Sequence, residues 1–459
     1  MTYKEAAGFL EEARRSGIRP GLDRIRALLE LLGRPDRKLN FIHIAGTNGK
    51  GSVSKYLESV YTVAGYRVAS FNTPQLLYYE ECYSFRGKPI SKALFAKCTE
   101  EVKEASEKLK ETPLGAPTEF ECMVALAMVF FREKKADPVI LEVGMGGLGD
   151  ATNVIERSLA SVLVRISFDH MQYLGNTLSE IAAQKAGIIK KDGLVLTLKQ
   201  EEEVLKVIGE TCGKQEARLV VSDTGELQKC SLGIGKQSFT TPQGLRLTIR
   251  MSGTYQKENA YLACKVLDTL SENYPVTSQD MKQGFLAAEK TGRFTMLDKE
   301  GRFYMDGAHN EGAALALKES IETYFTNKPI IYIMGMLKDK EYEKVSDILT
   351  GYAAAVIVIT PHTPRGLDKF ELARAVMDTS DRNRVRTGGK VVWGSLFPPV
   401  STADSLEEAV EMARLLSGEE GIILAFGSLS FLGELKEITD KEKSNGRSGK
   451  SAGSRKIAP

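Results

Sequence analysis

A short glycine-rich segment, residues 46–52, has a composition suited to binding phosphate. It consists of Gly46, Thr47, Asn48, Gly49, Lys50, Gly51 and Ser52. Glycines let successive backbone N–H groups point toward one anion, Lys50 supplies a full positive charge, and Ser52 offers a hydroxyl to a phosphate-bound Mg²⁺. The usual phosphate loop has Ser or Thr directly after the lysine, whereas Gly51 intervenes here. The segment predicts a nucleotide-binding loop; the alternative is a glycine turn that binds nothing.

Two further polar residues follow apolar runs, at the points where strands should end. Residues 138–143 predict a buried strand with Glu142 near its end, and residues 161–166 predict another, followed closely by His170. A buried carboxylate is costly unless it is paired or bound to a cation, so Glu142 is a candidate Mg²⁺ ligand. His170 is a candidate metal ligand or base, because ligands bind at the carboxyl ends of parallel strands. The alternatives are a partly exposed glutamate and a histidine satisfied by backbone groups.

Thr73 and Lys185 are candidates for which a structural role is equally open. Thr73 follows a strand predicted at residues 66–71, and its hydroxyl suits either a metal-binding loop or a plain connection. Lys185 lies in a helix predicted at residues 180–189, where a lysine is usually a solvated charge. Residue type and position therefore do not decide their roles.

In the second half of the chain, Asp306 and His309 lie three residues apart after a strand predicted at residues 302–305. This segment is either a site at a strand end or a helix N-cap with a tight turn.

The elements that must position these residues can be read from the order of strands and helices. A strand at 41–45 precedes the phosphate loop, and a helix is expected from Val53. Capping boxes predict two further helix starts, at Thr118–Glu121 and at Thr177–Glu180. After a boundary near residues 291–294 the pattern restarts, with strands predicted at 302–305, 330–334, 354–359 and 421–425. Strands that alternate with helices predict mostly parallel sheets covered on both faces.

Composition limits the class of protein. A chain of 459 residues is long enough for two domains. A net charge of +2 argues against nucleic acid as a partner, and no run is apolar enough to predict a membrane span. The six cysteines contain no C-x-x-C pair, which favours the reducing cytoplasm over a disulfide framework. We expect small-molecule substrates and a monomer.

The motifs, taken together, resemble the folylpolyglutamate synthase/dihydrofolate synthase family of the Mur ligase superfamily. The resemblance extends from residue 46 to about residue 433 and rests on separated motifs in the family's order: the loop at 46–52, Glu-Val-Gly-Met-Gly-Gly at 142–147, Asp-His at 169–170, Gln-Lys-Ala-Gly at 184–187, Gln256 with Asn259, and Asp-Gly-Ala-His-Asn at 306–310. The chain departs from the family at Gln75, where a histidine is usual, and at Cys82, where an arginine is usual.

The resemblance implies a fold and an activity. The fold is α/β, with a phosphate-loop ATPase domain of mostly parallel sheet at residues 1–292 and a smaller Rossmann-like domain at 293–437. Composition predicts a disordered tail at 438–459. The implied activity is ATP-dependent addition of L-glutamate to a folate alone or to both a folate and dihydropteroate, through an acyl phosphate formed while the two domains close on ATP.

The resemblance also implies roles for single residues. Lys50, Arg293 and His309 contact the ATP phosphates, Asn259 the adenine and Asp306 the ribose. One Mg²⁺ is held by Ser52, Thr73 and Glu142, and a second by His170 and a carbamylated Lys185.

Three alternatives stay open: a cell-wall Mur ligase, a non-catalytic nucleotide-binding module, and a phosphate-loop motor or switch. The last lacks the continuous Gly-Lys-Ser/Thr element.

Overall fold

The computed structural model describes residues 1–387 and 398–449. Its contacts divide the chain into two compact units. The first unit contains residues 1–251 and 255–290, and the second contains residues 252–254 together with the chain from Thr291 on. The division falls two residues before the boundary predicted at 292/293.

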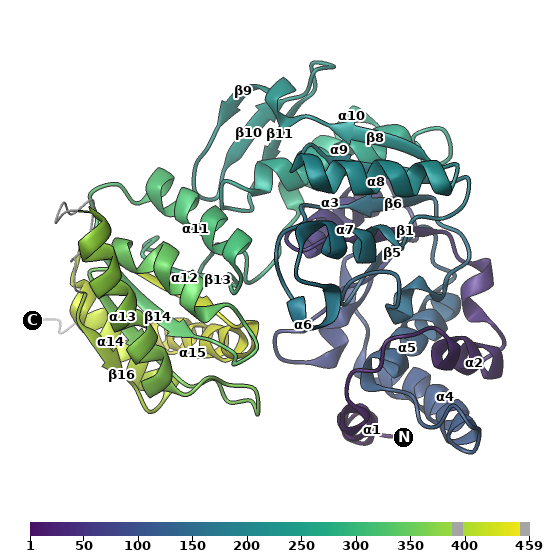
Figure 1. Cartoon of the computed structure of the whole chain (residues 1–459), viewed down its shortest axis with the longest axis horizontal. Helices are drawn as coiled ribbons and strands as arrows, with labels where there is room; N and C mark the ends of the chain where they lie inside the picture. The colour runs from purple at the N-terminus through teal and green to yellow at the C-terminus, as the bar shows by residue number, and fades with distance from the viewer. Residues whose placement is uncertain (388–397, 450–459) are drawn as a thin grey trace, which may run out of the picture. The chain divides into compact units, whose positions relative to one another are not determined.

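The first unit is built on a mostly parallel sheet with the strand order β4-β3-β2-β5-β1-β6-β7-β8 (Figure 1). From β2 to β8 in this order, neighbouring strands pair in parallel. At the other edge, β3 is antiparallel to both of its neighbours, β2 and β4. Their bounds are β1 (Phe41–Ala45), β2 (Ala69–Phe71), β3 (Tyr83–Phe85), β4 (Lys88–Pro89), β5 (Val139–Glu142), β6 (Ala160–Leu163), β7 (Leu194–Leu198) and β8 (Arg218–Ser222).

The central strands β1, β5 and β6 are buried along their whole length because helices cover both faces of the sheet. In β1, Ile42 and Ile44 join the core formed with α3, α9 and α10, whereas Phe41 joins the core formed with α1, α2, α4 and α5. Helices α7 and α8 cover a third cluster, which includes Ala45. The bounds are α1 (Tyr3–Ala13), α2 (Asp23–Leu31), α3 (Lys50–Val63), α4 (Lys92–Lys110), α5 (Glu119–Lys134), α6 (Met171–Leu174), α7 (Leu178–Ala186), α8 (Glu202–Lys214), α9 (Gln256–Thr269) and α10 (Ser278–Ala287).

Both predicted capping boxes are confirmed. Thr118 caps α5 and Thr177 caps α7, and in each case the N3 glutamate returns a hydrogen bond to the backbone of the cap residue. These caps satisfy backbone N–H groups that the first helical turn leaves without partners.

A small antiparallel sheet, β11-β10-β9, completes the first unit. Its strands are β9 (Gln228–Ser231), β10 (Gln237–Thr240) and β11 (Arg246–Ile249).

The second unit is a smaller α/β sandwich whose sheet has the order β12-β13-β17-β14-β15-β16. Strand β12 is antiparallel to β13, and the other pairs are parallel. The strands are β12 (Thr295–Met296), β13 (Phe303–Asp306), β14 (Ile330–Gly335), β15 (Ala355–Val358), β16 (Val400–Thr402) and β17 (Ile422–Gly427). The helices are α11 (Glu311–Tyr324), α12 (Tyr342–Leu349), α13 (Lys369–Thr387), α14 (Leu406–Ser417) and α15 (Leu429–Gly449).

The prediction of a disordered tail from residue 438 is wrong for residues 438–449, which continue α15. The helix is anchored because Leu432 and Leu435 are buried on its inner face and Thr439 is buried one turn later. Composition alone missed this, since the sequence after Thr439 is polar. Residues 450–459 lie outside the part of the chain that the structure describes.

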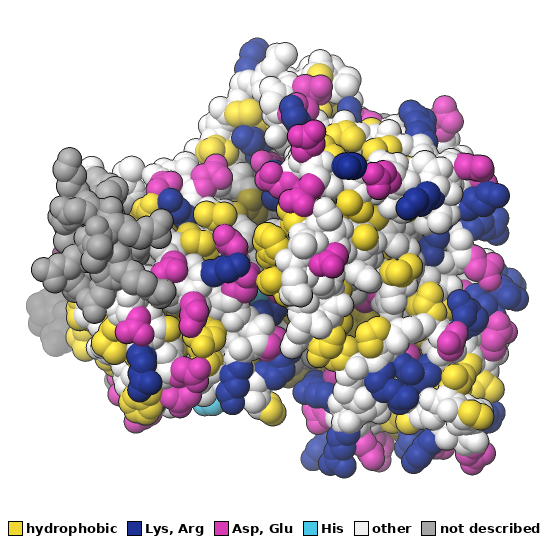
Figure 2. Space-filling model, viewed as in Figure 1, with side chains coloured by type: hydrophobic (Ala, Val, Ile, Leu, Met, Phe, Trp, Pro, Cys, Tyr) yellow, Lys and Arg dark blue, Asp and Glu magenta, His cyan; other side chains and the backbone are white. Residues whose placement is uncertain are grey.

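The surface carries charges of both signs. Figure 2 shows Lys and Arg side chains interspersed with Asp and Glu over the visible face. Of the described helices, none combines the length and apolar character required to cross a bilayer.

Candidate active site

The predicted phosphate loop joins β1 to α3, and its glycines are required by close packing. Gly46 and Gly49 have φ angles of +141° and +107°. A Cβ on Gly46 would lie 2.2 Å from a methyl carbon of Val164, and one on Gly49 would lie 2.3 Å from Oδ1 of Asn259. Only glycine combines such backbone angles with this lack of space. Helix α3 begins at Lys50, three residues earlier than expected, so the loop leads directly into a helix N-terminus.

Hydrogen bonds fix the shape of this loop. The N–H groups of Thr47 and Asn48 donate to the Arg165 carbonyl, at 2.9 and 3.3 Å. The Thr47 hydroxyl donates to the Ser167 carbonyl at 2.9 Å and accepts from the Ser167 N–H at 3.0 Å. The Lys50 ammonium folds back over the loop and donates to the carbonyls of Gly46 and Thr47, at 3.1 and 3.2 Å. The positively charged Lys50 ammonium is thereby held against the phosphate loop.

Glu142 lies beside the loop because β5 pairs with β1 in parallel, with Glu142 opposite Ile44. The side chain is buried, with 4% of its surface exposed. A Cβ on Gly51 would lie 3.5 Å from Oε2 of Glu142. The Glu142 carboxylate therefore lies within van der Waals range of the Cβ position of Gly51, against the loop.

Helix α9 brings two amides to the same loop. Gln256 donates from Nε2 to the Ser52 hydroxyl at 3.2 Å, and Asn259 donates from Nδ2 to Oε1 of Gln256 at 3.3 Å. Asn259 also packs against Gly49, as the close approach of its Oδ1 shows. The predicted Asn259 thus reaches the loop, and Gln256 joins it as a residue that positions Ser52.

Lys185 is a buried residue rather than a solvated one, with 3% exposure. Its ammonium donates to the Gly46 carbonyl at 2.9 Å. The glycine-rich loop after Glu142 makes this possible: Leu148 donates its N–H to the Gln184 carbonyl at 2.8 Å, and a Cβ on Gly147 would lie 2.7 Å from that same oxygen. The close backbone contact holds the end of α7 against the phosphate loop.

Thr73 and His170 lie at the same carboxyl edge of the sheet, after β2 and beyond β6 respectively. Thr73 is half-buried. His170 begins α6 with a φ of +51°, and its Nε2 lies 3.8 Å from Oδ1 of the buried Asp169. The order β2-β5-β1-β6 places Thr73, Glu142, the phosphate loop and His170 on four adjacent parallel strands. Their roles as metal ligands remain predictions.

The chemistry of the donor set fits Mg²⁺. Among residues 1–387 and 398–449, no group of three or more His, Cys, Asp or Glu side chains could form a metal cage. Mg²⁺ does not require one, because it is commonly held by one or two protein oxygens together with water and substrate phosphates. The buried Glu142 carboxylate beside the loop and the buried Ser52 hydroxyl are donors of this kind.

The second unit brings Arg293, Asp306 and His309 together. A Cβ on Gly307 would lie 2.5 Å from Nη1 of Arg293. The buried Asp306 carboxylate accepts from the N–H groups of Phe294 and Ala308, at 2.8 and 2.9 Å, and so ties the two segments together. Ring nitrogen Nδ1 of His309 lies 2.7 Å from the Gly307 carbonyl. Asn310 caps α11, so the N-cap reading of this segment also holds.

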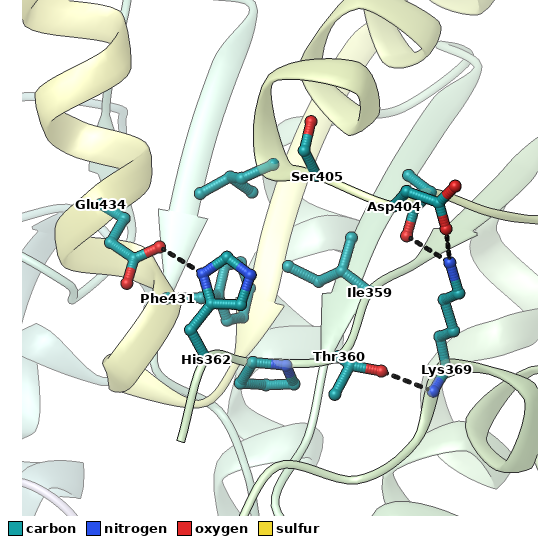
Figure 3. Close-up of a pocket in the computed structure, with 11 residues that line it drawn as sticks. Ile359, Thr360, His362, Lys369, Asp404, Ser405, Phe431 and Glu434 are labelled. Carbon is teal, nitrogen blue, oxygen red and sulfur yellow. Dashed lines mark hydrogen bonds and ion pairs between the residues drawn. The ribbon is translucent and has the colours of Figure 1, made fainter.

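A separate cavity of about 130 Å³ lies at the carboxyl end of β15 and β16 (Figure 3). Its floor is apolar, with Ile359 and Phe431, and its rim carries two ion pairs. His362 Nδ1 lies 3.4 Å from Oε2 of Glu434, and Lys369 pairs with Asp404. The charged side chains are paired with one another, and the described residues that line this cavity include none of the predicted site residues.

Comparison with known proteins defines the class. The Mur ligase middle domain matches residues 44–267, and the Mur ligase glutamate ligase domain matches residues 292–429. With a phosphate loop in the first unit and this second α/β unit, the chain is an ATP-dependent amide ligase of the Mur type.

Individual relatives show to which family of the Mur ligase superfamily the chain belongs. The chain is 32% identical over 448 residues to the dihydrofolate synthase/folylpolyglutamate synthase of Bacillus subtilis (strain 168), covering 95% of this chain and 98% of that protein. Its structure is similar to that of Mycobacterium tuberculosis folylpolyglutamate synthase complexed with ADP and AMPPCP, with a TM-score of 0.83 and 27% identity over 95% of this chain and 99% of that one. It also resembles E. coli FolC in complex with DHPP and ADP, with a TM-score of 0.81 and 25% identity over 96% and 99% of the two chains. The chain belongs to the folylpolyglutamate synthase/dihydrofolate synthase family of the Mur ligase superfamily.

The crowding at Gly49 gives a testable prediction. Gly49→Ala is expected to weaken nucleotide binding about 10-fold or more, because the new methyl group must displace Asn259 and the backbone must stay at an unfavourable φ. The measurement is the dissociation constant for ADP by calorimetry. Gly65→Ala is the matched control, since Gly65 also has a positive φ, +88°, but has open space around its Cβ position. Equal ADP affinities for the Gly49 variant and the unmodified protein would contradict this account.

Proposed function

We propose that this chain joins the amine of L-glutamate to a carboxylate of a folate and converts ATP to ADP and phosphate. The observation that carries the proposal is the convergence of Lys50, Lys185, Glu142 and Asn259 on one phosphate loop, in a chain that matches nearly the whole length of a curated dihydrofolate synthase/folylpolyglutamate synthase.

The chemistry explains the residue types. A carboxylate is a poor acyl donor, so the γ-phosphoryl group is first transferred to it, which gives an acyl phosphate. The glutamate nitrogen then attacks the acyl carbon, a C–N bond forms, phosphate leaves and the nitrogen loses a proton. We propose that Lys50, Arg293 and His309 stabilise charge on the phosphate oxygens. Asn259 contacts the adenine and Asp306 the ribose.

Two metal sites complete the proposal. Ser52, Thr73 and Glu142 hold one Mg²⁺, and His170 with a carbamylated Lys185 holds the other. When bound, Mg²⁺ supplies positive charge that balances the charge on the transferred phosphoryl group. Carbamylation forms a bond between the Lys185 nitrogen and the carbon of CO₂. The ammonium loses two protons in all, and the cation becomes an anionic oxygen donor that suits Mg²⁺.

One assay tests the function. The purified protein is supplied with ATP, Mg²⁺ and labelled L-glutamate, and dihydropteroate or tetrahydrofolate is offered in parallel. We expect glutamate incorporation and ADP release that depend on the pterin substrate. Incorporation with one substrate identifies a single activity, and incorporation with both identifies a bifunctional enzyme. ATP turnover that is indifferent to folates and stimulated by a cell-wall nucleotide-sugar peptide would overturn the proposal.

The cellular compartment and the oligomeric state are proposed on separate grounds. The six cysteines are all free thiols, which fits the reducing cytoplasm. We propose that the protein acts there as a monomer on small molecules, and light scattering of the purified chain tests the oligomeric state.

A further inference from the structure

Lys290 is a charged residue beside the phosphate loop that the sequence motifs do not single out. It is the last residue of the first unit and is half-buried. A Cβ on Gly51 would lie 3.3 Å from Cε and 3.7 Å from Nζ of Lys290. The same point lies 3.5 Å from Oε2 of Glu142. An ammonium and a carboxylate therefore converge on one spot against the loop.

A second observation supports this neighbourhood. The Cys82 thiol is buried, and burial raises its pKa. The Lys290 ammonium opposes that rise and the Glu142 carboxylate adds to it. Two side chains distant in sequence thus act on the same buried atom with opposite signs, which requires that both lie near it.

The buried Glu142 carboxylate needs a nearby positive charge, and Lys290 can supply it. A carboxylate with 4% exposure is strongly disfavoured in its charged form unless a positive charge is close. Glu142 is also the proposed ligand of a divalent cation. The Lys290 ammonium is close enough to serve as a counter-charge when no metal is bound, and a divalent cation at Glu142 would be repelled by it.

We propose that Lys290 is a positioning residue that competes with the divalent cation for Glu142. It orients the Glu142 carboxylate in the metal-free protein and gives it up when metal and nucleotide bind. The inference rests on the proposed role of Glu142 in metal binding.

The test measures metal binding directly, without nucleotide or folate. Free Mn²⁺ is titrated into the full-length protein and followed by electron paramagnetic resonance. Lys290→Gln is expected to bind Mn²⁺ about 10-fold more tightly than the unmodified protein, because a nearby positive charge is removed. Lys290→Arg, which keeps the charge, should restore the weaker binding. Lys282→Gln is the control, since Lys282 is exposed on the neighbouring helix α10.

Further outcomes decide the proposal. Adding Glu142→Gln to Lys290→Gln should abolish the gain in affinity. An unchanged or weaker Mn²⁺ affinity in Lys290→Gln overturns the proposal. The proposal also fails if neither protein binds Mn²⁺ at millimolar concentrations of the metal. A thermal melt of each variant checks that it is folded. If Mn²⁺ binding responds as expected while glutamate is never incorporated into folates, the inference stands and the proposed function fails.

Discussion

Lys50→Ala is expected to lower the ligase rate at saturating ATP by at least about 10³-fold, the size of effect seen when a preorganised group that stabilises transition-state charge is removed. In the structure, the Lys50 ammonium is held over the loop by the carbonyls of Gly46 and Thr47. It is therefore already in position before a phosphate arrives, and a smaller side chain in α3 cannot replace it.

The fold should survive this change. Lys50 is half-buried at the first residue of α3, and alanine is the best helix former. We expect the melting temperature of Lys50→Ala to stay within a few degrees of the unmodified protein. The measurements are glutamate incorporation and a thermal melt, with Lys206→Ala, an exposed lysine on α8, as the control. Undiminished incorporation by a folded Lys50 variant would remove the loop from the mechanism.

The phosphate loop and Glu142 were predictable because each rests on a local pattern. An apolar run followed by glycines and a lysine specifies a strand, a tight loop and a helix whatever the rest of the chain does. Likewise, an acid at the end of a run as apolar as residues 138–141 is costly to bury unless it is paired or bound to a cation. The structure adds the neighbours of Gly51, whose Cβ position lies close to the side chains of Glu142 and Lys290.

The positions of Lys185 and Lys290 could not be read from the same patterns. A lysine in a short helix is usually exposed, and Lys185 is buried only because Gly147 lets the backbone of the preceding loop contact the end of α7. Lys290 follows α10, and its place depends on the packing of Gly284 of α10 against Val60 of α3, where a Cβ would lie 2.5 Å from the Val60 Cα. Such contacts between distant segments have no periodicity to detect.

The strand order and the short edge strands also could not be predicted from the sequence. Strand β17 is the last in sequence yet lies between β13 and β14, which alternation of strands and helices does not specify. Strands β3 and β4 are only three and two residues long, too short for a period-2 pattern to stand out. Helix α4 was likewise not predicted, although Ser91 caps it and its buried positions recur at helical spacing.

Lys185→Ala is expected to lower the ligase rate about 10²-fold or more, and added short carboxylates should restore part of that loss. The residue has two possible contributions. One is the hydrogen bond from its ammonium to the Gly46 carbonyl. A hydrogen bond of a charged group contributes about 1.5–3 kcal/mol. The other is the carbamate that we propose, which would supply metal-binding oxygens. Acetate or formate entering the space left by the side chain can replace the oxygens but cannot replace the N–H donor.

The rescue therefore separates the two contributions. Glutamate incorporation by Lys185→Ala is measured with increasing acetate and, in parallel, with chloride at the same ionic strength. Lys191→Ala, an exposed lysine just beyond α7, controls for a general response to salt. Recovery specific to carboxylates supports the carbamate. A loss that acetate cannot reverse, in a variant whose melt shows it to be folded, assigns Lys185 to the shape of the phosphate loop. Full activity without any carboxylate would exclude both roles, because the buried nitrogen would then contribute neither a donor nor an oxygen to the reaction.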